Sequence, residues 1–328
     1  MYILSVESSC DDTSIAITKG KEVLSIKTAS QVSEHQLYGG VVPEIASRRH
    51  LENISALARL ALEEAGLKKE DINAVAVTNR PGLIGALLVG VNFAKGLAAS
   101  LNIPLIPVHH LRAHIAASYI NNPELKPPFL CLMVSGGNTV IVKVKDYNDF
   151  EIIGGTRDDA AGECFDKAAR AMGLNYPGGV MLDKIATTPN HKKYPLPTPR
   201  VEGSELDFSF SGLKTAVINL IHNTGQKGEE VDLPVLAATL RQKVCDILVN
   251  KTLLAAEKEN IKTLVIAGGV SANSELRERF LALKGYTVYM PKLQFCGDNA
   301  AMVGVAAAFE ENRADLTLNA YATMEIDQ

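Results

Sequence analysis

Three of the seven histidines in the chain, His109, His110 and His114, lie within six positions of one another. Histidines four residues apart project from one face of a helix, and neutral imidazoles placed in this way can bind a single transition metal. Two ligands make only half of a metal site, so a third must come from elsewhere. No glutamate lies between His110 and His114, which excludes the HExxH pattern of zinc proteases. Ordinary helix polarity or core hydrogen bonding is the alternative use of such a pair.

A carboxylate able to supply the third ligand is Asp298, in the segment "FCGDNAAM". An apolar helix is expected to begin there, and aspartate is a common residue at a helix N-cap. Asp298 is therefore a candidate either for a helix cap or for completing a His–His–Asp set.

Two glycine turns are expected to follow apolar strands. "SGGN" at 135–138 lies between two strands, and "AGG" at 267–269 lies between a strand and a helix. Glycine allows backbone N–H groups to approach a phosphate or a nucleotide closely. Neither turn has the Walker A or the GxGxxG pattern, so each one alone is compatible with a plain turn.

Acidic residues gather in two further segments. In "ESSCDD", Glu7, Asp11 and Asp12 surround a predicted hairpin turn, where carboxylates either form the turn or face a phosphate or a metal. In "DDAAGECFDKAAR" the charged residues lie beside an apolar helix face, with Lys167 four positions after Glu163. An exposed, ion-paired helix is the plain interpretation of that segment.

The elements that must position these residues alternate between strands and helices, which indicates largely parallel sheets covered by helices. The order of a strand, a small polar turn and two further strands occurs twice in the chain, which indicates two similarly built lobes. A loop is expected at 188–210 because of its prolines. The expected strands lie at 2–7, 13–18, 22–28, 72–78, 104–110, 129–134, 139–144, about 150–154, 262–269 and 286–290. The expected helices lie at about 50–65, from the turn at 79–82 to about 100, at 159–173, 233–258 and 271–283, and from about 298.

Composition indicates a globular protein without a general affinity for nucleic acid. The chain has 328 residues and a net charge of −4, so RNA binding would need a local patch or a partner subunit. The one obviously basic stretch is "TTPNHKKYPLPTPR", for which a solvated loop is the alternative. Five scattered cysteines without CxxC spacing indicate reduced thiols in a cytosolic protein. The first residues lack the pattern of a signal peptide, and Asn92 and Lys95 interrupt the longest apolar segment, which predicts a buried helix, a cytoplasmic location and no membrane.

Taken together, the motifs resemble those of the bacterial TsaD family of tRNA adenosine threonylcarbamoyltransferases. The resemblance covers essentially the whole chain and rests on ten segments in the family's order: "ESSCDDTS", "HQLYGGVVPEIASRRH", "PGLIGALLVG", "HHLRAH", "VSGGNT", "DDAAGECFDKAAR", "YPGG", "FSFSGLKT", "GGVSANSELR" and "CGDNAAM". It implies an α/β, two-lobed fold like that of actin, sugar kinases and Hsp70 (ASKHA), each lobe a mixed sheet flanked by helices. It also implies an N-terminal lobe at 1–117, completed by a C-terminal helix at about 300–328, and a C-terminal lobe at 118–299.

The resemblance implies transfer of a threonylcarbamoyl group from threonylcarbamoyl-AMP to N6 of adenosine 37, in tRNAs that read codons starting with A. By position, His110, His114 and Asp298 would be the metal ligands, and Asp11 would lie near the reacting group and assist proton removal. The residues that would line the adenylate site are Met133, Val134, Ser135, Gly136, Gly137, Asp166, Gly179, Asp183 and Asn273.

The ligand set suits one divalent metal ion, Fe²⁺ or Zn²⁺, with Mg²⁺ as a further option. The partners that the resemblance implies are tRNA, a TsaB-like paralogue and a TsaE-like ATPase. The chain departs from the family pattern at four places: Asp12 replaces a glutamate, Asn138 a histidine, Arg80 a glycine and Gly297 a threonine.

Two other functions remain open from sequence. One is a metal-dependent glycoprotein endopeptidase, an activity named in an older description of the family, although no glutamate stands beside either histidine. The other is a small-molecule kinase or a nucleotide-gated binding module of the same fold, neither of which would need a His–His–Asp set.

Overall fold

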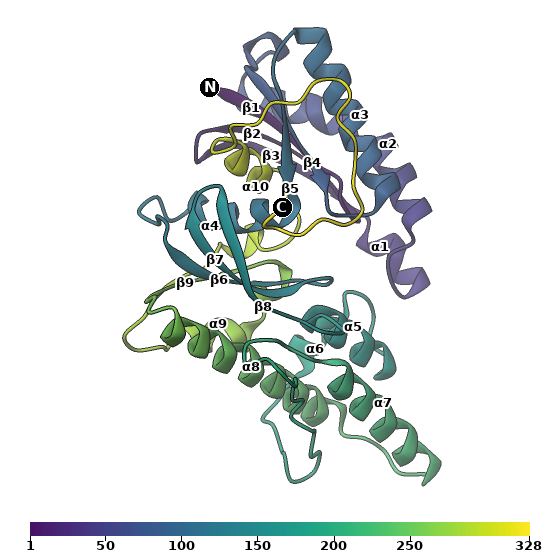
Figure 1. The fold of residues 1–328 in the computed structure, drawn as a ribbon. Coiled ribbons are helices and arrows are strands. Elements are labelled where there is room, and N and C mark those ends of the chain that lie inside the picture. Colours follow the sequence, from purple (N-terminus) through teal and green to yellow (C-terminus); the bar gives the residue numbers. More distant parts are fainter. The chain divides into compact units, whose positions relative to one another are not determined.

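The computed structural model describes residues 1–328, and the chain divides into two compact units (Figure 1). Unit 1 comprises Met1–Pro127, Lys145–Phe150 and Pro291–Gln328, and unit 2 comprises Pro128–Val144 and Glu151–Met290. Three segments of the expected second lobe, residues 118–127, 145–150 and 291–299, belong with the first unit.

Unit 1 is built on a five-stranded mixed sheet with the strand order β3-β2-β1-β4-β5. The strands are β1 (Tyr2–Glu7), β2 (Asp12–Lys19), β3 (Glu22–Ser30), β4 (Ala74–Arg80) and β5 (Leu105–His109). The first three are antiparallel neighbours, whereas β4 and β5 are parallel to β1 because a helix connects each to the strand before it. The five predicted strands of this unit are confirmed to within about two residues.

Helices cover both faces of this sheet. On one face α2 (Pro43–Ala65) and α3 (Ile84–Leu101) share an apolar core with the strands, and on the other face α4 (His110–Ile120) packs with α10 (Ala300–Ala307). Short helical turns occur at α1 (Val32–His35), η1 (Gln36–Tyr38), η2 (Lys69–Asp71) and η4 (Leu293–Phe295). The expected start of a helix at His50 was wrong: Pro43 takes the first position of α2, where its missing N–H costs no hydrogen bond.

Helix α3 is long and apolar enough to cross a membrane by length and composition alone. It instead packs on β4 and α2 through small and apolar side chains, among them Leu87, Val91 and Ala94. The predicted buried helix is therefore confirmed in place, and its buried residues lie on one face.

The C-terminal segment differs from the expectation. Helix α10 ends at Ala307, and no helix extends to residue 328. The tail instead lies along the edge of the sheet, where Ala314 N–H donates to Leu105 O and Tyr321 N–H donates to Asn79 O, both at 2.9 Å. These long-range hydrogen bonds satisfy the backbone of the tail without a helix.

Unit 2 contains a second five-stranded mixed sheet, with the order β10-β9-β6-β7-β8. Its strands are β6 (Phe129–Val134), β7 (Thr139–Asp146), β8 (Asp149–Gly155), β9 (Thr263–Ala267) and β10 (Thr287–Tyr289). Strands β6 and β9 are parallel, with Met133 opposite Ala267, so their carboxyl ends lie at the same edge. The prediction of two mixed sheets flanked by helices is confirmed.

The helices of unit 2 are α5 (Ala161–Ala171), α6 (Gly178–Ile185), α7 (Ser211–Gln226), α8 (Leu233–Lys258) and α9 (Ser274–Leu281), with the turn η3 (Gly269–Ala272) before α9. Helices α5, α8 and α9 are confirmed predictions, and the loop expected at 188–210 contains no helix or strand apart from an isolated bridge at Phe208. Helices α6 and α7 were not predicted. Two glycines open α6 and weaken its sequence signal, because glycine is a poor helix former.

Candidate functional site

The two spaced histidines occupy the first turns of α4, directly after β5 ends at His109. Their rings lie edge to face with centroids 4.6 Å apart. Asp298 joins them across 184 residues of chain. Its Oδ1 lies 3.1 Å from His114 Nε2 and 3.5 Å from His110 Nε2. The structure therefore brings together the three residues of the expected His–His–Asp set, all within unit 1.

Asp298 is not the cap of the last helix, which corrects one of its two expected uses. Asn299 caps α10, since its side chain accepts from Met302 N–H at 3.0 Å. The carboxylate of Asp298 thus faces the two histidines instead of the helix end. At the neighbouring Gly297, a Cβ atom would meet nothing within 4 Å, so the structure leaves room for a side chain at this position.

A fourth residue, Glu7, completes the cluster from the end of β1. Its carboxylate is fully buried and accepts hydrogen bonds from Ser9 N–H at 2.6 Å and from the Thr78 hydroxyl at 2.7 Å. His110 Nδ1–H donates to its Oε2 at 3.1 Å. Glu7 thus lies behind His110, on the opposite side of the ring from Asp298.

The charges of the cluster support one another. Burial raises the pKa of the Asp298 carboxyl, but attraction to His110 and the hydrogen bond from His114 outweigh burial and bring this pKa to about 2. Burial likewise opposes ionisation of Glu7, yet His110 holds its pKa below the usual range. For His110 the two carboxylates overcome burial and raise the pKa to about 9. Without metal, an imidazolium thus lies between two carboxylates, and a cation would displace its Nε2 proton.

The donor set fits a divalent transition metal. The ligand atoms of His110, His114 and Asp298 all lie within 4.8 Å of one another. Ligand atoms bound to a tetrahedral ion at about 2.0–2.1 Å lie roughly 3.4 Å apart, close to the separations from Asp298 to the two histidines. Two imidazoles and one carboxylate leave a coordination position open, as catalytic sites do. His114 Nδ1 is buried without a hydrogen-bond partner, so only its Nε2 is engaged within the chain.

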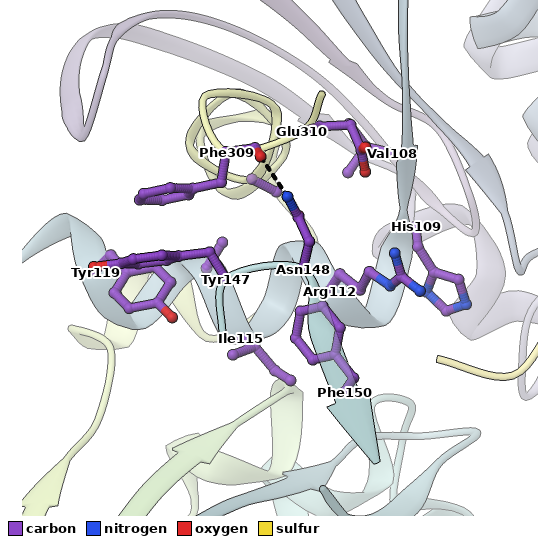
Figure 2. A pocket seen from close by; sticks show the side chains of 12 residues that line it. Val108, His109, Arg112, Ile115, Tyr119, Tyr147, Asn148, Phe150, Phe309 and Glu310 are labelled. Carbon is purple, nitrogen blue, oxygen red and sulfur yellow. Dashed lines mark hydrogen bonds between the residues drawn. The ribbon is translucent and has the colours of Figure 1, made fainter. Parts of the chain in front are cut away.

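His109 has a structural role. Its Nδ1 accepts from Leu111 N–H at 3.2 Å and caps α4, while its Nε2 lies 3.3 Å from Met324 O in the C-terminal tail. It also lines a small pocket with Arg112, Tyr119 and Phe309 (Figure 2). At 3.6 residues per turn, the cavity-lining residues of α4 lie on the face away from the metal-site histidines, so this cavity is separate from the cluster.

Asp11 lies in the turn between β1 and β2 and is 8% exposed. The next residue, Asp12, opens β2, and its Oδ1 is buried without a hydrogen-bond partner. Burial, together with the negative charges of Asp11, Asp298 and Glu7, raises the pKa of Asp12 to about 7. The turn therefore concentrates carboxylates close to the metal-site cluster.

The expected adenylate-binding residues all lie in unit 2. Met133 and Val134 end β6, and Ser135, Gly136 and Gly137 form the turn into β7, closed by Ser135 N–H donating to Asn138 O at 2.8 Å. A Cβ atom at either glycine would meet nothing within 4 Å, so the backbone of this turn is open on its outer side.

Helix α6 links the other expected adenylate residues in two pairs. Gly179 N–H donates to Asp166 Oδ1 at 2.9 Å, and Asn273 Nδ2–H donates to Asp183 Oδ1 at 3.3 Å. Asp183 also accepts from the Ser274 backbone N–H at 3.1 Å and from Arg241 Nη1 at 2.8 Å. Asp183 thereby fixes the start of α9, where Asn273 is the N-cap.

Some residues of these sites escaped the sequence-based prediction. Arg241, in the middle of α8, contacts Asp183 and also Glu275 at 2.9 Å. No local signal marks it, because its partners lie 58 and 34 residues away. Glu7 stood in a segment already noted for its carboxylates, but its pairing with His110 depends on the order of strands in the sheet.

Comparison with known proteins gives consistent results. The family model described as "TsaD: tRNA N6-adenosine threonylcarbamoyltransferase" matches residues 22–305. Proteins of that name from Clostridium botulinum (strain 657 / Type Ba4) and Clostridium beijerinckii are 49% and 46% identical, and each alignment covers 99% of this chain and 98% of the relative.

Two solved structures resemble the chain in fold. Component A of the (R)-2-hydroxyglutaryl-CoA dehydratase of Acidaminococcus fermentans matches with a TM-score of 0.54 at 17% identity, covering 94% of this chain and 97% of that one. HypF of T. kodakarensis matches with a TM-score of 0.60 at 14% identity, covering 93% of this chain and 47% of that one. These likenesses concern the fold alone, which is of the actin, sugar-kinase and Hsp70 type.

Proposed function

The chain belongs to the TsaD family of tRNA N6-adenosine threonylcarbamoyltransferases, and from this premise we propose which of its residues carry the reaction. The activity is transfer of a threonylcarbamoyl group to N6 of adenosine in tRNA. We take the donor to be threonylcarbamoyl-AMP and the acceptor to be adenosine 37 of tRNAs that read codons starting with A. Both assignments follow from family membership.

We propose that His110, His114 and Asp298 hold one divalent metal ion, Fe²⁺ or Zn²⁺ in preference to Mg²⁺. The observation that carries this assignment is the convergence of the three side chains within one cluster of unit 1. Two nitrogen ligands favour zinc or iron over magnesium, which prefers oxygen. When bound, such an ion would supply positive charge that stabilises negative charge developing in the transition state.

The adenylate is assigned to unit 2. The open turn at Ser135, Gly136 and Gly137 offers backbone N–H groups to the phosphate, at the carboxyl ends of parallel strands where nucleotides bind in such sheets. Met133, Val134, Asp166 and Gly179 would line the same site. Asp183 and Asn273 would shape it, since their mutual hydrogen bond fixes the start of α9.

In the transfer, a bond forms between adenine N6 and the carbamoyl carbon, and the bond from that carbon to the phosphate oxygen breaks. AMP leaves with the electron pair, and N6 loses one proton. The amine is a weak nucleophile because its lone pair is delocalised into the ring, so orientation contributes more than a strong base. We assign Asp11 to accept the proton, on account of its place in the first turn near the cluster.

The partners follow from the same premise. The net charge of −4 offers no general basic field, so the tRNA would be held by a local patch or by a partner. We propose that a TsaB-like paralogue and a TsaE-like ATPase act with the chain in the cytoplasm, and that the chain alone is slow on tRNA. Units 1 and 2 would be the two lobes of the fold.

The endopeptidase and kinase alternatives are not favoured. Neither histidine of α4 has the adjacent glutamate of a zinc protease. A kinase has no use for a His–His–Asp cluster, whereas the family assignment accounts for it.

The test is reconstitution with tRNA, threonylcarbamoyl-AMP and the two partners, followed by mass spectrometry of the nucleosides and metal analysis of the chain. We expect His110→Ala to lose both the bound metal and the modified nucleoside. His222→Ala, at an exposed position on α7, serves as the matched control and should retain both. Unchanged metal content and activity in His110→Ala would refute the site assignment.

A further inference from the structure

The Glu7 carboxylate joins three elements of unit 1 behind the metal-site histidine. It receives hydrogen bonds from the turn after β1 through Ser9, from β4 through Thr78, and from α4 through His110. It is 0% exposed, so water cannot replace any of these partners. Because an ionised carboxylate only accepts hydrogen bonds, each partner must present a hydrogen atom to it.

This requirement determines which nitrogen of His110 carries hydrogen. Nδ1 lies 3.1 Å from Glu7 Oε2, where a nitrogen lone pair would face a negatively charged oxygen. Nδ1 therefore carries the hydrogen, and Nε2, which faces Asp298, is the nitrogen left for a metal ion. The Ser9 hydroxyl also lies 3.2 Å from Nδ1, but it is uncharged and can act as donor or acceptor, so it does not impose the same choice.

We propose that Glu7 is a positioning residue of the metal site, which holds His110 with Nδ1 protonated and Nε2 directed at the ion. This inference rests on the proposed metal site at His110, His114 and Asp298. Histidine ligands of metals commonly donate their second N–H to a carboxylate, and loss of that partner weakens metal binding by about 10- to 100-fold. Glu7 is held more firmly than a surface carboxylate would be, because Ser9 and Thr78 fix both of its oxygens.

The first experiment measures the affinity of the full-length chain for Zn²⁺ by competition with a chromophoric chelator. We expect Glu7→Gln to bind Zn²⁺ about 10- to 100-fold more weakly than wild type. A glutamine amide has one acceptor oxygen, so either Ser9 N–H or His110 Nδ1–H would face an N–H₂ group. Ser9→Ala removes the competing contact to Nδ1 and keeps the backbone N–H that donates to Glu7, so it should bind Zn²⁺ nearly as wild type does.

The second measurement needs no variant and holds if Glu7→Gln fails to fold. In the Zn²⁺-loaded wild-type chain with ¹⁵N-labelled histidine, NMR should show the His110 proton on Nδ1 and a metal-bound Nε2. A proton on Nε2, an unchanged affinity in Glu7→Gln, or an equal loss in Ser9→Ala would overturn the inference while leaving the metal site intact. A wild-type chain that binds no Zn²⁺, Fe²⁺ or Mg²⁺ would overturn the proposed site and the inference together.

Discussion

Gly268 is the position where a single methyl group should have the largest effect near the proposed adenylate site. It follows β9 with φ 90° and ψ 167°, a backbone conformation that is essentially restricted to glycine. A Cβ atom built there would lie 2.4 Å from Val134 O, at the end of the neighbouring strand β6. Val134 O belongs to the backbone of the sheet, and the backbone at residue 268 fixes the position of the Cβ atom, so neither atom can rotate away.

The cost of Gly268→Ala has two parts. Holding a non-glycine residue in this conformation costs about 1–3 kcal/mol. Forcing an extra methyl group into a packed region costs a further 1–3 kcal/mol or so. The free energy of unfolding should therefore fall by roughly 2–6 kcal/mol, a large share of the 5–15 kcal/mol typical of a domain. The shift of Val134 should also weaken binding of an adenylate at the adjoining turn.

Gly269→Ala is the matched control, because a Cβ atom there meets nothing within 4 Å and its φ is not in the left-handed region. Its unfolding free energy should change by less than about 1 kcal/mol. Urea unfolding of both variants, followed by circular dichroism, gives the comparison. If the two alanines are equally stable, the close approach of β9 to β6 does not constrain residue 268 and the reasoning fails.

Three further outcomes are expected. Gly137→Ala adds a methyl group to open space, so the unfolding free energy should stay within about 1 kcal/mol of wild type. The same methyl group should weaken the binding of an unreactive threonylcarbamoyl-adenylate analogue, measured by calorimetry. Unchanged binding would show that the phosphate does not bind at this turn. Asn299→Ala removes the cap of α10 and should cost about 0.5–2 kcal/mol in urea unfolding, with an uncapped start of α10 visible as faster amide exchange at Met302. Burial lowers the pKa of His50 below 6.5, so the unfolded chain takes up a proton below pH 6.5 that the folded chain resists. Stability measured by urea unfolding should therefore fall as pH drops below about 6.5, by at most about 1.4 kcal/mol per pH unit, and His50→Gln should make the decline shallower.

The sheets were predictable because their signals are local. Strands such as Phe129–Val134 consist of consecutive apolar residues bounded by turn residues, and those features survive in any tertiary context. The loop at 188–210 was equally clear from its prolines. Helix α6 was missed because Gly178 and Gly179 open it, and glycine weakens the helix signal in the sequence. The structure nevertheless needs glycine at 178, because a Cβ atom there would lie 2.8 Å from Asp166 Cα. The glycine that weakens the local helix signal is required by the tight packing of α5 on α6.

The end of the chain shows the opposite limit. Residues after Ala307 were expected to continue a helix, but they lie along the sheet through hydrogen bonds to Asn79 and Leu105. Those partners are more than two hundred residues away in the sequence, and no hydrophobic pattern in the tail indicates that it pairs with them. Only the order of strands in the sheet makes the edge available.

The metal site combines both kinds of information. Spacing alone placed His110 and His114 on one helix face, and their common orientation required nothing from the rest of the fold. Glu7 and Arg241 each act on a residue distant in sequence, so their roles appear only when the strands and helices are assembled. The role of a residue that belongs to a local pattern can be predicted from the sequence. The role of a residue that pairs with a distant partner can be assigned only from the structure.

The orientation of Asp298 toward the two histidines depends on the next residue, Asn299. Aspartate and asparagine are both strong N-cap residues, and the pair Asp298-Asn299 leaves two candidates for the single cap of α10. Asn299 accepts from Met302 N–H, and its Nδ2–H donates to Gly297 O at 2.9 Å, which fixes the chain on either side of Asp298. Asp298 cannot then turn to the helix end, and its charge is directed at the histidines. From sequence, Asp298 could be either a helix cap or a metal ligand. Asn299 resolves this ambiguity because the cap requires no charge and an uncharged asparagine can provide it, whereas the metal-site cluster requires the carboxylate of Asp298.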